Sequence, residues 1–310
     1  MPKQENILNT KSKRMLQIPT FDKPATILEG SAETLFGFMK SHGHRADLIF
    51  TSPPYNLGKE YEPLLSIKEY VSWQRAIITL ASKCLSNHGN ICWQVGNYVA
   101  NGQIIPLDVL LHPIFTSLGF KLRNRIVWHF GHGLHAKRRF SGRYETILWY
   151  SKQDDYFFDL DSVRIPSKYP GKRHYKGPNK GHLSSDPRGK NPEDYWEFEE
   201  DVWDIPNVKG NHVEKTTHPC QFPVGLAERI ILSLCPAGGL VVDPFSGVAT
   251  SGVAALIHGR RFIGSETSKK YVQVGIKRLK DAIAGRIRYR PHDRPIYDHT
   301  LSPLAHRPKR

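Results

Sequence analysis

The chain has 310 residues, of which 39% are hydrophobic, so it can form one large α/β domain with an insertion or two modest domains. It has no apolar run of about 18 residues that could cross a bilayer, and its N-terminus lacks the apolar region of a secretory signal, so we expect a cytoplasmic protein. Its formal net charge of +15 favours a polyanionic partner such as nucleic acid.

The spacing of the cysteines bears on two further features, disulfide bonds and bound zinc. Cys84, Cys92, Cys220 and Cys235 form no Cys-x-x-Cys pair. This spacing argues against a disulfide framework and against a structural zinc site. We therefore predict a protein of a reducing compartment with no bound metal.

The first half of the chain alternates strand and helix patterns. In chain order it predicts a strand and then a helix within 25–39, a buried strand at 46–50, a helix at 67–85 ended by SNHGN, a strand at 91–96, a helix with an internal proline at 104–120, and strands at 122–130 and 144–152. Strands that alternate with helices indicate an α/β fold with a mostly parallel sheet.

The composition changes at about Arg164. Residues 164–192 are rich in Lys, Arg, Gly and Pro and have no periodic apolar face, which predicts a long basic loop or a small insertion. Order is expected to resume near DVWDIP at 201–206. The second half then predicts a helix at 222–235, a strand at 239–243, a helix at 249–259 and a strand at 260–266. The basic, proline-rich tail after Ala284 is predicted to be poorly ordered.

A possible ligand-binding turn lies within residues 239–266. A strand, a turn of small residues, a helix and a second strand ending in Glu266 fit a site where backbone amides approach a ligand and an acid accepts ribose hydroxyls. There is no Gly-x-Gly-x-x-Gly, and Asp243 would repel a pyrophosphate but could receive the ammonium of S-adenosylmethionine. The alternative is an ordinary βαβ turn whose small residues serve packing.

The stretch TSPPYN at 51–56 follows the buried strand directly. Two prolines end a strand abruptly and leave a rigid turn that carries a hydroxyl and an aromatic ring. Together with DPFSGVAT at 243–250, it resembles the catalytic and cofactor motifs of the DNA amino-methyltransferases. The catalytic motif comes first, as in the beta class, and the resemblance covers roughly residues 25–280.

The resemblance implies a Rossmann-like S-adenosylmethionine-dependent methyltransferase fold with an inserted target-recognition region. In the motif Ser52-Pro53-Pro54-Tyr55, the Ser52 hydroxyl and the Pro53 carbonyl would accept the N–H bonds of an exocyclic amine as it attacks the methyl group. Tyr55 would stack on a base flipped out of duplex DNA. Transfer would be direct, with no covalent bond between enzyme and base.

The same resemblance assigns the cofactor site. It implies that S-adenosylmethionine is bound by Asp243, Phe245, Ser246, Gly247, Thr250 and Glu266, with Ser31 of LEGS near the adenine ring. The sequence departs from the family at Ala249, where a second glycine is usual. A methyl group is tolerated there if the backbone φ is negative.

The target base is left between two alternatives. Serine at position 52 points to cytosine N4, because the adenine enzymes mostly carry Asp or Asn there. Tyr-Asn after the prolines and the segment RRFSGRYETILWYSK at 138–152 resemble adenine-modifying relatives, so we favour adenine N6. Two competing hypotheses remain. The protein is a catalytically silent nucleic-acid-binding module, or it is a methyltransferase that acts on RNA or protein.

Two motifs suggest other chemistry at first sight. Pro-Cys-Gln around Cys220 occurs at the nucleophile of cytosine-C5 methyltransferases, but here it precedes the cofactor motif and better matches the beta-class segment that opens a helix beside the cofactor. His129, His132 and His135 lack a nearby carboxylate or cysteine and precede Lys137, so they fit phosphate contact better than a metal site.

Basic residues of two segments are the predicted DNA contacts. They are Lys137, Arg138 and Arg139 before the 144–152 strand, with Phe140 and Tyr144 beside them, and Lys172, Arg173 and Lys176 in the basic insertion. Glu145 and Trp149 fit a structural role equally well. For the insertion, a solvated surface loop is the alternative.

The predicted organisation follows from these assignments. Residues 22–163 form the catalytic half of the methyltransferase domain, 164–209 the target-recognition insertion, 210–285 the cofactor-binding half, and 286–310 a basic tail. The resemblance to type II systems implies a cognate restriction endonuclease that acts on the same site without binding this chain. It leaves a monomer and a dimer open and gives no reason to expect a membrane partner.

Overall fold

The computed structural model of the chain describes residues 15–18, 25–58, 64–130, 135–196, 208 and 212–290. The expected order near DVWDIP at 201–206 and the basic tail beyond residue 290 lie outside the described residues.

One large sheet organises the described part of the molecule. Its strand order is β1-β2-β11-β10-β3-β4-β8-β7-β9. The strands are β1 (Met15–Ile18), β2 (Ala25–Glu29), β3 (Ala46–Thr51), β4 (Leu85–Val95), β7 (Lys121–His129), β8 (Tyr144–Ser151), β9 (Tyr195–Trp196), β10 (Leu240–Asp243) and β11 (Arg261–Glu266). The neighbouring strands β2, β11, β10, β3 and β4 run parallel to one another. Strand β8 is antiparallel to both β4 and β7. The predicted α/β fold with a mostly parallel sheet is confirmed.

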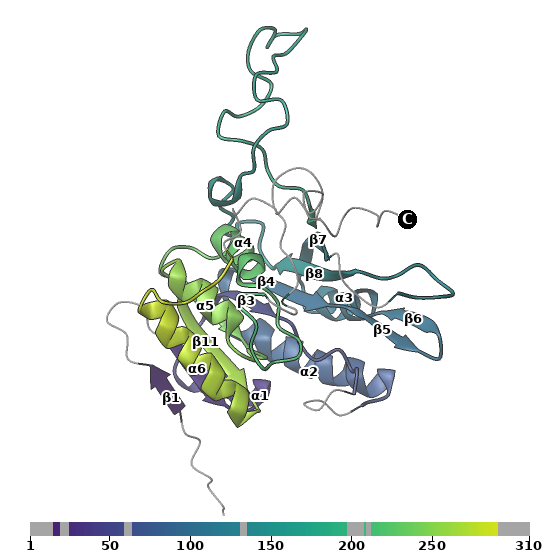
Figure 1. Cartoon of the computed structure of the whole chain (residues 1–310), viewed down its shortest axis with the longest axis vertical. Helices are drawn as coiled ribbons and strands as arrows, with labels where there is room; N and C mark the ends of the chain where they lie inside the picture. The colour runs from purple at the N-terminus through teal and green to yellow at the C-terminus, as the bar shows by residue number, and fades with distance from the viewer. Residues whose placement is uncertain are drawn as a thin grey trace, which may run out of the picture.

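Helices cover both faces of this sheet (Figure 1). They are α1 (Ala32–Ser41), α2 (Ile67–Cys84), α3 (Leu107–Ser117), α4 (Val224–Leu234), α5 (Thr250–Ile257) and α6 (Lys269–Ile283). One apolar core lies between the sheet and α1, α2 and α3, and a second lies between the sheet and α4, α5 and α6. In the central strand β3, Phe50 points to the second core and Ile49 to the first, because successive side chains of a strand alternate.

The order of the strands brings the two sequence motifs together. Val241 and Val242 of β10 pair with Leu48 and Ile49 of β3, although about 190 residues separate them in the chain. From β3 the chain continues through α2 to β4 on one side, and from β10 it continues through α5 to β11 on the other. In open α/β sheets, ligands bind outside the carboxyl ends of strands at such a switch point.

Two predicted boundaries differ from the observed ones. The helix predicted at 104–120 begins only at Leu107, because β5 (Asn97–Ala100) and β6 (Gln103–Pro106) form a hairpin before it. Asn101 and Gly102 at its tip both have positive φ, as Asn-Gly hairpin turns require. The SNHGN segment does not separate helix from strand, since β4 starts at Leu85 and passes through it with a register shift against β3.

The basic insertion is partly an extension and partly a member of the sheet. After a short 3-10 helix, η1 (Asp161–Val163), the chain projects from the body as a long arm (Figure 1). The two ends of the arm meet where Ile165 forms an antiparallel bridge with Lys190. β9 then pairs with β7 at the edge of the sheet, so residues 195–196 of the insertion belong to the sheet. Within the described ranges, no helix combines the length and the apolar character that a membrane span needs.

Candidate active site

The Ser-Pro-Pro-Tyr turn is held in place by neighbours on both sides. The Tyr70 hydroxyl of α2 donates to the Pro54 carbonyl at 3.1 Å. Asn56, which is 2% exposed and has a φ of 61°, exchanges two hydrogen bonds of 2.7 Å with the Leu65 backbone. Both contacts fix the backbone immediately after the strand, so the turn presents Ser52 and Tyr55 in a defined geometry.

Ser52 and Tyr55 belong to a chain of hydrogen bonds that ends at a carboxylate. The Ser52 Oγ and Tyr55 Oη atoms are 2.7 Å apart, and Tyr55 Oη donates to Glu145 Oε2 at 3.0 Å. Gln94 Nε2 of β4 donates to the same carboxylate oxygen at 2.6 Å. Burial, followed by the negative charge of Glu145, raises the pKa of Tyr55 well above its usual value. Tyr55 is therefore a neutral donor at physiological pH.

The turn after β10 wraps closely around the carboxyl end of β11. Gly247 has a φ of 51° and donates its N–H to Glu266 Oε2 at 3.1 Å. Ser246 bonds the Ser265 carbonyl through its backbone N–H at 2.9 Å and through its hydroxyl at 3.0 Å. Burial raises the pKa of Glu266. These hydrogen bonds join the turn to the end of the neighbouring strand, and Ser246, Gly247 and Glu266 all line the cavity described below.

Ala249 departs from the expected backbone conformation. Its methyl group was expected to be tolerated with a negative φ, but φ is 60° and ψ is 42°. This is the left-handed region, which disfavours residues with a Cβ atom by about 1 to 2 kcal/mol. Ala249 is fully buried, and its N–H donates to the Ser246 carbonyl at 2.7 Å. The turn therefore keeps the glycine-type backbone geometry without the glycine.

Asp243 lies behind the wall of the cavity. It is 1% exposed and accepts hydrogen bonds from Thr51 Oγ1 at 2.7 Å, from the Phe245 N–H at 3.1 Å and from Ser251 Oγ. Burial raises its pKa to about 6. These contacts tie the carboxyl ends of β3 and β10 to each other. The contact between Asp243 and the cofactor ammonium stays a prediction, and the observed bonds give this carboxyl group a structural task as well.

A cavity of about 720 Å³ opens at the carboxyl ends of the parallel strands. Both motifs contribute to its wall, which includes Ser31, Ser52, Tyr55, Phe245, Gly247 and Glu266. The rings of Trp73 and Phe245 meet edge to face with centroids 5.6 Å apart and form an apolar part of it. An apolar wall and a carboxylate at the end of β11 fit a nucleoside with ribose hydroxyls. The residues present therefore fit S-adenosylmethionine.

The remaining predicted cofactor residues also lie at this cavity. Thr250 lines it at the start of α5, and its hydroxyl accepts a hydrogen bond of 2.9 Å from the buried Arg278 guanidinium. Ser31 is the N-cap of α1, where its side chain accepts from the Thr34 N–H. Cys220 lies on the wall with an exposed side chain, and its own N–H donates to His218 Nδ1 at 3.2 Å. The contacts of Thr250 and Ser31 with a ligand remain predictions, whereas no ligand contact was predicted for Cys220.

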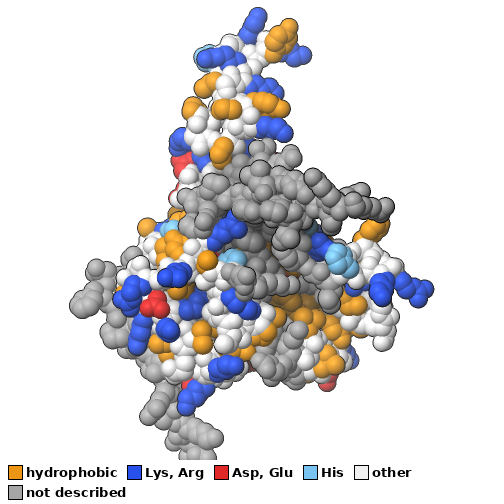
Figure 2. All heavy atoms as spheres, in the orientation of Figure 1, with side chains coloured by type: hydrophobic (Ala, Val, Ile, Leu, Met, Phe, Trp, Pro, Cys, Tyr) orange, Lys and Arg blue, Asp and Glu red, His pale blue; other side chains and the backbone are white. Residues whose placement is uncertain are grey.

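The predicted DNA contacts lie outside the cavity, on two exposed segments. Lys137, Arg138 and Arg139 precede β8, where the side chain of Phe140 is 98% exposed. Lys172, Arg173 and Lys176 lie on the projecting arm, and Figure 2 shows blue side chains along it. Tyr169 and Tyr175 are also exposed on this arm. The arm therefore presents cations and aromatic rings together.

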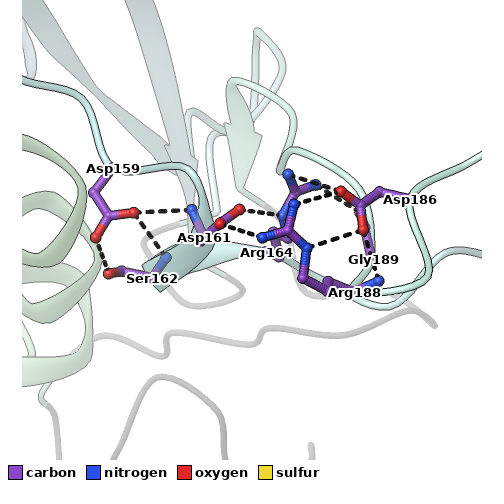
Figure 3. Close-up of polar contacts among 7 residues, drawn as sticks. All are labelled: Asp159, Asp161, Ser162, Arg164, Asp186, Arg188 and Gly189. Carbon is purple, nitrogen blue, oxygen red and sulfur yellow. Dashed lines mark hydrogen bonds and ion pairs between the residues drawn. The ribbon is translucent and has the colours of Figure 1, made fainter.

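Ion pairs hold the root of the arm (Figure 3). Arg164 contacts Asp161 at 2.7 Å and Asp186 at 3.2 Å, and Arg188 bonds the same two carboxylates. The Arg188 side chain lowers the pKa of Asp186 well below its usual value. Arg164 also donates to the Gly189 carbonyl at 2.8 Å. The acidic residues neutralise the root, so the excess positive charge lies farther out.

The histidines of the 129–135 segment do not come together as a described group. His129 lies in β7 beside the Tyr195 ring, with centroids 6.4 Å apart, and His135 is 3.2 Å from the Arg143 guanidinium. His132 lies outside the described residues. In the part of the chain that the structure describes, no three His, Cys, Asp or Glu side chains are arranged to hold a metal ion.

Three residues of the site were not found from the sequence. Tyr70 bonds the Ser-Pro-Pro-Tyr turn and Gln94 bonds the Glu145 carboxylate, and Arg278 bonds the Val248 carbonyl and Thr250 behind the turn that follows β10. Each acts through a contact between distant segments, which no local pattern encodes. Arg278 offered one signal, since it is a charged residue among buried positions of α6.

Comparisons with known proteins agree with this geometry. Residues 46–277 match the DNA methylase family. The type II methyltransferase M.BglII of Bacillus subtilis is 47% identical over 75% of this chain and 63% of its own length, so the match spans less than two thirds of that relative. The DNA adenine methyltransferase YhdJ of Escherichia coli K12 is 31% identical over 82% of both chains. The chain therefore belongs to the DNA methylase family, a class of S-adenosylmethionine-dependent DNA amino-methyltransferases.

Solved structures confirm the predicted fold. The PvuII DNA methyltransferase, named as cytosine-N4-specific, has a TM-score of 0.61 and 21% identity and covers 86% of this chain and 95% of its own. The complex of M1.HpyAVI with S-adenosylmethionine has a TM-score of 0.52 and 22% identity and covers 82% of this chain and 100% of its own. The solved structures thus confirm the Rossmann-like methyltransferase fold predicted from two short motifs. The predicted family and its cofactor are confirmed by the match to the DNA methylase family.

Proposed function

We propose that this protein transfers a methyl group from S-adenosylmethionine to the exocyclic N6 amine of adenine in duplex DNA. The observation that carries the proposal is the position of Ser52 and Tyr55 on the wall of the same cavity as Phe245, Gly247 and Glu266. A cofactor held by the second motif would then lie next to a base held by the first.

The chemistry assigns a task to each group. S-adenosylmethionine supplies an electrophilic methyl group. The amine of a base is a poor nucleophile because its lone pair is delocalised into the ring. Ser52 Oγ and the Pro53 carbonyl accept its N–H bonds as the nitrogen pyramidalises, which stabilises the transition state more than the ground state. Tyr55 stacks on the flipped base. Glu266 accepts the ribose hydroxyls.

Adenine is favoured by a relative with a stated target. YhdJ, which is named as an adenine methyltransferase, matches this chain over 82% of its length. The Tyr55-Asn56 pair and the segment 138–152 also resemble adenine-modifying enzymes. Ser52 supports a second candidate, methylation of cytosine N4, because adenine enzymes mostly carry Asp or Asn at this motif position.

The arm and the 137–140 segment are proposed to contact DNA. Their exposed cations suit phosphate oxygens, and the exposed Tyr169, Tyr175 and Phe140 suit base or sugar contacts. The relatives named as type II methyltransferases support a role in protecting sites from a cognate restriction endonuclease. That endonuclease would share the DNA sequence without binding this chain.

Identification of the methylated nucleoside tests the proposal. Purified protein is incubated with genomic DNA and methyl-labelled S-adenosylmethionine in EDTA, and the DNA is digested to nucleosides for mass spectrometry. We expect label in N6-methyladenine. Label in N4-methylcytosine alone would replace adenine by the second candidate. No transfer despite stoichiometric cofactor binding would indicate a catalytically silent module.

A further inference from the structure

Glu145 lies at the end of the hydrogen-bond chain that starts at Ser52. It is the second residue of β8, far from either motif in the sequence, and it lines the cavity. Its Oε2 atom accepts from Tyr55 Oη at 3.0 Å and from Gln94 Nε2 at 2.6 Å. Glu145 belongs to neither the catalytic nor the cofactor motif, although it falls within the segment 138–152 that resembles adenine-modifying relatives. The sequence alone left it with a structural role as an equal alternative.

The chemistry of a carboxylate fixes the direction of every bond in this chain. An ionised carboxylate only accepts hydrogen bonds, so the single hydroxyl proton of Tyr55 points to Glu145. The 2.7 Å contact between Ser52 and Tyr55 must then be donated by Ser52. The one proton of the Ser52 hydroxyl is thereby occupied, and its lone pairs remain to accept.

The surrounding backbone and side chains keep Glu145 and Tyr55 in this arrangement. A Cβ atom built on Gly96, just after β4, would lie 3.2 Å from the Tyr55 ring and 3.7 Å from Glu145 Cγ. The end of β4 therefore packs against both side chains at once. Gln94, which is 1% exposed, restrains the carboxylate from the same strand. The contact is thus built into the sheet and does not depend on an exposed loop.

We propose that Glu145 is a positioning residue for methyl transfer, which orients the Ser52 hydroxyl through Tyr55 so that its lone pairs face the target amine. The inference rests on the proposed role of Ser52 as the acceptor. The amine N–H bonds become stronger donors as the nitrogen gains positive charge, so an oxygen that already presents lone pairs needs no reorientation. If these hydrogen bonds ran in the reverse direction, the Ser52 hydroxyl proton would point at the amine protons and repel them.

Two conservative substitutions interrupt this chain of hydrogen bonds at different points. Tyr55→Phe keeps the ring that stacks on the base but removes the link between Ser52 and the carboxylate. Glu145→Gln keeps the shape but removes the charge and no longer requires Tyr55 to donate. We expect each to lower the single-turnover rate of methyl transfer about 10- to 100-fold, the range for one hydrogen bond to a charged group. Affinities for S-adenosylmethionine and for duplex DNA should stay within about twofold.

The double variant is the decisive measurement. If both substitutions break the same chain of hydrogen bonds, the double variant should transfer the methyl group no more slowly than the slower single variant, within about twofold. The double variant combines Tyr55→Phe with Glu145→Gln. Fully additive losses would overturn the proposal, because they would show that the two side chains act separately. Glu69→Gln, which changes an exposed carboxylate of α2, is the matched control and should keep the parental rate.

The series separates this inference from the function on which it rests. A slow Ser52→Ala together with a parental rate in Glu145→Gln would overturn the role of Glu145 and leave Ser52 as the acceptor. A parental rate in Ser52→Ala would instead overturn the catalytic role of the turn itself. Loss of cofactor and DNA affinity in Glu145→Gln would assign it a structural role. If that variant fails to fold, Tyr55→Phe still tests the chain without altering β8, and a parental rate there would contradict it.

Discussion

The cavity and the basic arm differ in how the fold holds their functional side chains. At the cavity, the carboxyl ends of adjacent strands are joined through buried groups such as Thr51 and Asp243, and the Ser-Pro-Pro-Tyr turn is bonded to α2 and β8. On the arm, residues 168–184 are all exposed, and the ion pairs of Figure 3 hold only its root.

This difference fits two kinds of work. Transfer of a methyl group needs acceptors fixed to within a fraction of an ångström, which a rigid sheet supplies. Contact with the DNA backbone needs positive charge on an accessible surface and tolerates adjustment. We therefore propose that the molecule separates chemistry, at the carboxyl ends of its strands, from DNA affinity, on an extension outside them.

The largest expected effect is that of Ser52→Ala. Loss of one preorganised acceptor in the transition state should lower the single-turnover rate about 100- to 1,000-fold. DNA affinity should stay near the parental value, because the hydroxyl serves the transition state rather than the phosphate backbone. A large loss of DNA affinity would break the separation of the two regions.

A smaller effect, of a different kind, is expected from Lys172→Ala with Lys176→Ala on the arm. Each lost phosphate contact lowers the slope of log K against log salt by about 0.9. The single-turnover rate at saturating DNA should be unchanged. Lys277→Ala with Lys280→Ala provides the control, since these exposed lysines lie on α6, far from the arm in Figure 1. An unchanged slope in the arm variant would assign the arm to a solvated surface.

The smallest effect is expected from Cys220→Ser. The thiol lies on the cavity wall, but direct attack of the amine on the methyl group requires no bond between the enzyme and the base. Activity should stay within about twofold, as for substitutions outside structural and catalytic features. A covalent complex with 5-fluorocytosine DNA that disappears in this variant would show that the thiol is the nucleophile.

Local patterns were sufficient to predict most of the architecture. The apolar strand before Ser52, the strand before Pro244 and the helices on either side of the sheet have clear hydrophobic periodicity. The hairpin at 97–106 was missed although Asn101-Gly102 carries a strong turn signal, because the apolar residues around it continue into the helix. The helix α6 was missed as well, although Tyr271, Gly275 and Leu279 recur at helical spacing.

The geometry of the site could be predicted only in part. Short motifs identify Ser52, Tyr55 and the cofactor turn, since these residues are adjacent in the chain. The positive φ of Ala249 results from the closure of that turn against β11 and has no signature in the residue itself. The bond between Tyr55 and Glu145 joins residues 90 apart in the chain and depends on β8 being the neighbour of β4.

The separation of chemistry from affinity is tested most directly by one crossed measurement. Salt-dependent DNA binding and single-turnover methyl transfer at saturating DNA are determined for Ser52→Ala and for Lys172→Ala with Lys176→Ala. We predict that Ser52→Ala keeps the parental salt slope and loses the rate, while the arm variant loses about 1.8 in slope, for two phosphate contacts, and keeps the rate. If each variant changes both quantities to a similar degree, catalysis and DNA binding are not divided between the cavity and the arm.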